Sequence, residues 1–197
     1  RNKNGVWNIG APDQQLKSEA SLASNALVDL DVNGRMELVR LELDFSLLEL
    51  IEILLSREFD VELSVYDPAP GLGFEKKPSE REKLEIPFST TTFRLKGFFP
   101  TVKADLNGDG YPDFLTSGGG EKFVFKPGGP EGPIGARRVT QKMFTDGMIR
   151  FGDWTGDGLM DFLIFDPQRY GSDVYLAKNR GLLPGTPESL RPVPPSP

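Results

Sequence analysis

Oxygen-bearing side chains recur at one fixed spacing in three short stretches of this sequence. The stretches begin at Asp29, Asp105 and Asp153, and each places such side chains at its first, third, fifth and ninth positions, with glycine at the sixth. The candidate ligands are Asp29, Asp31, Asn33 and Glu37; Asp105, Asn107, Asp109 and Asp113; and Asp153, Thr155, Asp157 and Asp161. This alternation creates no apolar face, and clustered carboxylates repel one another unless a cation lies between them. Calcium binds about six to eight oxygens of these kinds, so the spacing predicts calcium loops.

The sixth and seventh positions support the same interpretation. Glycine at the sixth position can adopt positive φ, which lets a loop curl around an ion. The backbone carbonyl of the seventh residue is then a further candidate ligand, and these residues are Arg35, Tyr111 and Leu159. We expect Ca²⁺ in the second and third loops and treat the first as an additional candidate. There Glu37 is longer than aspartate, and Val32 replaces the glycine found at the fourth position of the others.

An EF-hand loop opens in the same way and is the first alternative. It needs a bidentate glutamate at position twelve and a helix on each side. Position twelve is occupied here by Arg40, Thr116 and Ile164, which offer no carboxylate. The segments after the loops are apolar or alternating, as is typical of strands. The sequence therefore favours calcium held between two strands, with the last ligand at position nine.

The motif D-x-N-G-D-G-x-x-D followed by an apolar strand resembles the FG-GAP / VCBS repeat of integrin α-subunit-like β-propellers. The second unit has the full motif, the third has Thr155 in place of asparagine, and the first is the most degenerate. The resemblance implies a mainly β protein, a partial β-propeller of about three blades, with calcium between adjacent strands of each blade. The expected units are an arm or tail of a preceding blade (1–23), three repeats (24–95, 96–140 and 141–184) and a Pro-rich linker (185–197).

One helix interrupts the β pattern of the first repeat. Residues 46–57 have helical periodicity, and Ser46 with Glu49 forms a capping-box pattern. Five aliphatic residues share one face of this helix: Leu47, Leu48, Ile51, Leu54 and Leu55. We expect this amphipathic insertion to pack on its own blade, and the alternative is that it binds a partner chain. The mixed-charge run 75–85 is expected to be a solvated loop between blades.

Composition excludes several functional classes. The 197 residues contain no Cys and no His, which excludes Cys/His zinc sites, thiol catalysis and His-based triads. The formal net charge is −6, whereas a nucleic-acid-binding protein needs a basic face. No uncharged apolar run of about 18 residues is present, so we expect no membrane span in this segment. Because the sequence starts at Arg1 without a signal-like segment, we interpret it as part of a longer or processed protein.

These features predict a non-enzymatic, calcium-binding β-propeller-type module of a secreted or cell-surface protein, with the periplasm as another location. Its expected role is adhesion or scaffolding, with a protein partner or the remaining blades of a longer chain. The alternative is a carbohydrate-binding propeller or part of a polysaccharide-active enzyme, with a glycan as ligand. Against catalysis, the obvious acidic side chains are committed to metal and no other paired carboxylates are evident.

Overall fold

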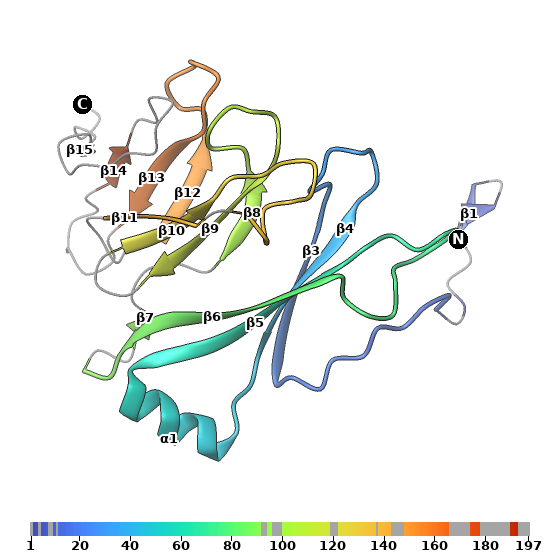
Figure 1. Cartoon of the computed structure of the whole chain (residues 1–197), viewed down its shortest axis with the longest axis horizontal. Helices are drawn as coiled ribbons and strands as arrows, with labels where there is room; N and C mark the ends of the chain where they lie inside the picture. The colour runs from blue at the N-terminus through green and yellow to red at the C-terminus, as the bar shows by residue number, and fades with distance from the viewer. Residues whose placement is uncertain are drawn as a thin grey trace.

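The structure is a computed structural model that describes residues 2–3, 5–7, 10, 12–91, 94–95, 100–118, 122–136, 138–142, 148–165, 174–177 and 190–192. Three antiparallel sheets form the body of the described structure, and a short hairpin of β1 (Asn2–Lys3) and β2 (Val6–Trp7) precedes them (Figure 1). Parts of the predicted units, including most of the predicted linker, lie outside the described residues. No helix within the described ranges is long and apolar enough to cross a membrane.

Each sheet follows the chain in order, strand after neighbouring strand. The first sheet contains β3 (Leu22–Val28), β4 (Glu37–Leu43), β5 (Glu58–Tyr66), β6 (Glu80–Ser89) and β7 (Arg94–Leu95). The second contains β8 (Thr101–Ala104), β9 (Asp113–Gly118), β10 (Lys122–Lys126) and β11 (Val139–Lys142). The third contains β12 (Met148–Gly152), β13 (Asp161–Phe165), β14 (Val174–Ala177) and β15 (Leu190–Pro192). The mainly β prediction is confirmed, and consecutive four-stranded meanders are the form that propeller blades take.

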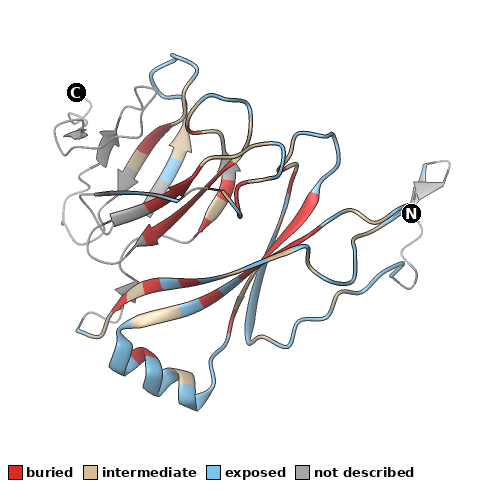
Figure 2. Ribbon diagram, in the orientation of Figure 1, coloured by how far each residue is buried: buried red, intermediate tan, exposed pale blue. Residues whose placement is uncertain are grey.

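The first two sheets share a hydrophobic core. Val61 and Leu63 on β5 and Ile86 on β6 are almost fully buried, and they cluster with Phe114 of β9 and Ile134 of the loop after β10. Figure 2 shows this burial as red bands along the inner strands. The contiguous core holds the start of the second sheet against the first, which fixes the loops that the two sheets carry.

The charged run 75–85 differs from its predicted loop state, because residues 80–85 belong to strand β6. Exposed Arg81, Lys83 and Glu85 alternate with half-buried or buried residues, and the two cations meet acidic residues of β5. Arg81 lies 3.3 Å from Glu62, and Lys83 lies 2.7 Å from Asp60. Opposite charges that face each other across neighbouring strands stabilise the pairing, so a mixed-charge sequence can form a strand when one face is solvated.

The predicted helix is present as α1 (Leu47–Ser56), and its capping box is confirmed. The Glu49 amide donates to Ser46 Oγ at 3.2 Å, and the Ser46 amide donates to Glu49 Oε2 at 2.9 Å. The prediction that its apolar face packs on the blade is wrong. Only Ile53 of the helix is buried, while the five aliphatic residues of the predicted face are exposed.

Two strands were not expected from the sequence. β11 adds a fourth strand to the second sheet by pairing with β10. β15 lies in the region expected to be a Pro-rich linker, and it pairs with β14. Proline is tolerated in such edge strands, where its missing N–H need not join a ladder.

Candidate metal centre

The three acidic loops occupy equivalent places in the three sheets. Each joins the first strand of a sheet to the second, and its ninth residue is the first residue of the second strand. Glu37 starts β4, Asp113 starts β9 and Asp161 starts β13. These residues pair with the last residues of the preceding strands, Val28, Ala104 and Gly152. In Figure 1 the three loops lie along the same, upper side of the molecule. Each loop therefore connects two adjacent strands of its sheet, as the sequence predicted.

The three loops share one backbone conformation. The glycines at the sixth position have positive φ as expected: 86° at Gly34, 92° at Gly110 and 86° at Gly158. The fourth position is also left-handed, with φ of 78° at Gly108 and 72° at Gly156. Val32 adopts the same conformation in the first loop, with φ of 58°. A β-branched residue rarely takes this conformation, so the first loop keeps the shared geometry at a cost in strain.

The side chain at the first position is held by backbone amides of its own loop. Asp105 accepts from the amides of Gly108 and Gly110, both at 2.8 Å. Asp153 accepts from the amides of Gly156 at 2.7 Å and Gly158 at 2.9 Å. In the first loop, Asp29 accepts from Asn33 and Gly34. The left-handed residues thus turn successive amides toward one carboxylate.

The third and fifth positions are tied in a similar way. At the fifth position Asn33, Asp109 and Asp157 each accept from the amide of the seventh residue, at 2.8, 2.9 and 3.1 Å respectively. At the third position Asp31 accepts from the Asn33 amide, and Asn107 accepts from the Asp109 amide. The seventh carbonyls of Arg35, Tyr111 and Leu159, and the Thr155 hydroxyl, stay predictions as ligands.

The ninth side chain is buried in all three loops and accepts from amides at the loop entrance. The Leu30 amide donates to Glu37 at 2.7 Å, and the Leu106 amide donates to Asp113 at 2.6 Å. Asp161 accepts from Trp154 and Thr155 at 3.1 and 3.0 Å. The ninth residue therefore also closes the loop through hydrogen bonds, which the spacing of the sequence did not indicate.

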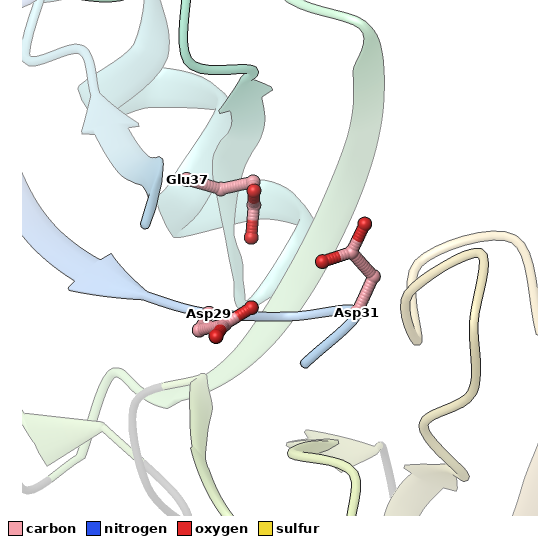
Figure 3. A group of neighbouring side chains, drawn as sticks. All are labelled: Asp29, Asp31 and Glu37. Carbon is pink, nitrogen blue, oxygen red and sulfur yellow. The ribbon is translucent and has the colours of Figure 1, made fainter. Parts of the chain in front are cut away.

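Three carboxylates converge in the first loop. Oxygens of Asp29, Asp31 and Glu37 all lie within 4.8 Å of one another, and Figure 3 shows them facing a common space. Burial raises the pKa of Glu37, and the negative charges of Asp31 and Asp29 raise it further. The hydrogen bond from the Leu30 amide lowers the pKa and only partly offsets these effects. A bound dication would relieve this repulsion. The oxygen-only donor set suits a hard cation such as Ca²⁺.

The second and third loops do not repeat this trio, since Asn107 and Thr155 stand where the first loop has Asp31. No other trio of acidic side chains comes as close within the part of the chain that the structure describes. The loop that the sequence ranked lowest is thus the one in which three carboxylates converge. Metal binding by the other two loops stays a prediction.

Asp113 of the second loop has a partner from outside its loop. Its Oδ1 accepts from the Gly128 amide at 2.7 Å, and Gly128 lies in the Gly/Pro-rich segment after β10. Burial raises the pKa of Asp113 to about 6, against the lowering effect of the amides of Gly128 and Leu106. A Cβ at Gly128 would lie 2.4 Å from the Pro112 carbonyl oxygen, so this position needs glycine for its close approach.

The same Gly/Pro-rich segment borders the first loop. A cleft of about 350 Å³ separates them, and it is lined on one side by Asp31, Arg35 and Glu37 and on the other by Glu131 and Gly132. Arg35 is fixed beside it by hydrogen bonds to the carbonyls of Pro68 at 3.1 Å and Ala69 at 2.8 Å. Sequence reasoning missed this cleft, because its two walls come from different sheets.

A comparison with known protein families found a match to the segment that contains the second and third loops. The family model for FG-GAP-like repeats matches residues 105–164. Neither the curated proteins nor the solved structures gave a match to this chain. The matched segment runs from the first ligand position of the second loop to strand β13. Residues 105–164 are an FG-GAP-like repeat.

Proposed function

We propose that this chain is a non-enzymatic calcium-binding module of β-propeller type that mediates adhesion or scaffolding in a secreted or cell-surface protein. The observation that carries the proposal is the convergence of Asp29, Asp31 and Glu37 on one space. Two more loops with the same backbone conformation and the same strand positions support it, as does the FG-GAP-like repeat over 105–164.

In this proposal calcium has a structural role and stabilises the folded hairpins. The ion neutralises carboxylates that otherwise repel, and it ties the end of the first strand to the start of the second. Binding to the folded form alone stabilises it by mass action, by about 2.7 kcal/mol at a ligand concentration of 100 Kd. An affinity on the order of 10⁻⁴–10⁻³ M, as in other extracellular modules, fits surroundings rich in calcium.

The decisive experiment is a thermal melt during calcium titration, with isothermal calorimetry on the same samples. We expect the Tm to rise with calcium and to fall back with excess chelator. Asp31→Ala removes one oxygen-bearing side chain of the trio, whereas Glu75→Ala removes an exposed acidic residue far from the loops in sequence. Asp31→Ala should weaken calcium binding at the first loop by about tenfold or more, and the control should leave it unchanged.

The second loop is tested by Asp109→Ala. This change should lower the Tm in calcium and matter less in excess chelator, where only the hydrogen bonds to the Tyr111 amide and Asn107 are lost. Equal losses in both conditions would count against ligation at this loop. A wild-type Tm that does not change with calcium concentration would overturn the proposal as a whole.

A further inference from the structure

Helix α1 presents its apolar side away from the sheet that carries it. Its one buried residue, Ile53, faces β5, and Ile51 and Leu55 lie nearly opposite it on the helix. Leu48 and Leu55 are 78% and 80% exposed, and Ile51 is 49% exposed. Figure 2 shows most of the helix in pale blue, the colour of exposed residues. A contiguous row of exposed aliphatic side chains is the mark of a protein-binding surface rather than of ordinary solvent exposure.

Acidic side chains border this apolar row. Glu52 lies next to Leu48 and Leu55 around the helix. On the sheet side of Glu52 a groove of about 240 Å³ is lined by Glu49, the buried Ile53 and four more carboxylates: Asp44, Glu58, Asp60 and Glu85. Lys83 is the one cation among the described residues of the groove, and Asp60 already neutralises it at 2.7 Å. The last turn of the helix carries no basic residue.

We propose that this surface binds a basic amphipathic helix of a partner protein. Aliphatic residues three or four positions apart along such a helix would cover Leu48, Ile51 and Leu55. Lysine or arginine beside them would face Glu52 and the acidic groove. A helix laid along an apolar row with charges matched at its edge combines burial with electrostatic complementarity.

The charge pattern selects this occupant over two others. A second copy packed through the same helix would bring its own Glu49 and Glu52 to the interface rather than a basic flank. An anionic lipid surface would be repelled by the same carboxylates, whereas membrane-surface helices carry basic residues beside their apolar face. The inference deepens the interaction role proposed above but does not depend on the metal loops.

The test uses the full chain and a fluorescent synthetic helix of leucine and lysine, with leucine at every third or fourth position. A second peptide carries glutamate in place of lysine. We expect the basic peptide to bind and the acidic peptide to bind at least tenfold more weakly. Raising the salt concentration from about 0.05 to about 0.5 M should weaken the basic complex, because exposed charges are screened.

Matched variants locate the binding surface. Ile51→Asn and Glu52→Lys should each weaken binding of the basic peptide by about tenfold or more, in line with loss of a central interface side chain or reversal of a charge. Leu72→Asn and Glu75→Lys make the same kinds of change at an exposed leucine and an exposed acid of the turn after β5, and should leave binding within about twofold. Circular dichroism checks that α1 persists in each variant.

Several outcomes would overturn the inference. They are equal binding of both peptides, equal losses in the control variants, self-association in sedimentation that Ile51→Asn abolishes, or adsorption to anionic vesicles that depends on Ile51. Peptide binding is measured with calcium and with chelator. If the peptide binds in chelator and the Tm does not change with calcium, this inference stands and the metal proposal fails. If the Tm rises with calcium but the peptide does not bind, the metal proposal stands and this inference fails.

Discussion

Leu159 of the third acidic loop lies directly against Gly108 of the second, so that a Cβ added at Gly108 would stand 2.8 Å from Leu159 Cδ2. The two loops belong to neighbouring sheets, and Leu159 is the seventh residue of its loop while Gly108 is the fourth residue of its own. The contact makes the shape of one loop depend on the side chain of the next.

Gly108→Ala should therefore destabilise the protein more than Gly110→Ala. Both glycines have positive φ, at 78° and 92°, and alanine costs roughly 1 kcal/mol in that conformation. A Cβ at Gly110 meets nothing within 4 Å, whereas at Gly108 it displaces Leu159. Because Leu159 Cδ2 is the end of a flexible side chain, we expect the added cost to stay below the roughly 1–3 kcal/mol of core overpacking. Urea denaturation of both variants measures the difference, and Leu159→Ala should remove it. A difference that survives in the Leu159→Ala background would contradict the contact.

Val32→Gly should stabilise the protein. Val32 is the one valine in a position where the equivalent residues, Gly108 and Gly156, are glycine, and its φ is 58°. Strain of this kind costs about 1–3 kcal/mol. The entropy of a glycine in the unfolded chain offsets about 0.5–1 kcal/mol of the gain. The side chain is 54% exposed, so its removal loses little burial. We expect a higher urea midpoint for Val32→Gly and a lower one for Gly156→Val.

The pH dependence of the calcium-free protein should reveal the buried Asp113. Burial raises its pKa to about 6, whereas an unfolded aspartate titrates near 3.9. Between these values the folded state binds more protons than the unfolded state, so stability falls as pH rises from about 4 to about 6 and then levels off. Glu37, whose pKa burial also raises, acts in the same direction.

Calcium should reverse this trend, because metal binding needs ionised carboxylates. The gain in Tm from calcium should therefore grow as pH rises through about 6. Melts at several pH values, with and without chelator, measure both effects. In chelator, Asp113→Asn should remove much of the fall in Tm between about pH 4 and pH 6. An unchanged dependence of the Tm on pH would show that another group causes the fall.

The ion pair between Lys126 of β10 and Glu82 of β6 should matter more than those on the outer face of the first sheet. Lys126 Nζ lies 2.6 Å from Glu82 Oε1 and also donates to the Ile134 carbonyl at 2.9 Å. Lys126 is buried, so Lys126→Met leaves the half-buried carboxylate of Glu82 without its partner and should cost about 1.5–3 kcal/mol. Adding Glu82→Met should recover most of the loss.

The exposed pair of Arg81 and Glu62 is the matched control, with its atoms 3.3 Å apart. Arg81→Met should cost about 1 kcal/mol or less, as solvent-exposed pairs do. Chemical denaturation of Lys126→Met, Glu82→Met and the double variant completes a double-mutant cycle for the inner pair. Similar costs for Lys126→Met and Arg81→Met would contradict a special role of the inner pair in joining the two sheets.

The sequence predicted what depends on neighbouring residues. The loop spacing, the hairpins around the loops and the capping box at Ser46 are local patterns, and each is present in the fold. It did not predict features that depend on segments far apart in the chain. The strand over residues 80–85 forms by pairing with β5, which lies earlier in the chain, and Gly128 reaches Asp113 from a different part of the second repeat.

The helix and the first loop show why the remaining predictions differed. Periodicity identified the apolar face of α1, but nothing local determines which face meets the sheet, and the structure buries Ile53 instead. Val32 and Glu37 departed from the motif and lowered the rank of the first loop. The fold nevertheless holds Val32 in the conformation of glycine and brings Glu37 to Asp29 and Asp31.

The three loops span equal lengths of chain between paired strand ends, from Val28 to Glu37, from Ala104 to Asp113 and from Gly152 to Asp161. The last candidate ligand is thus also the residue that sets the alignment of its hairpin. Because their ends are paired in the same way, we expect one loop to replace another without altering the strands around it. A single residue inserted into or deleted from the strand pairing, in contrast, would turn the ninth side chain to the opposite face of its sheet. A change of loop length should therefore disturb these sites more than a substitution within them.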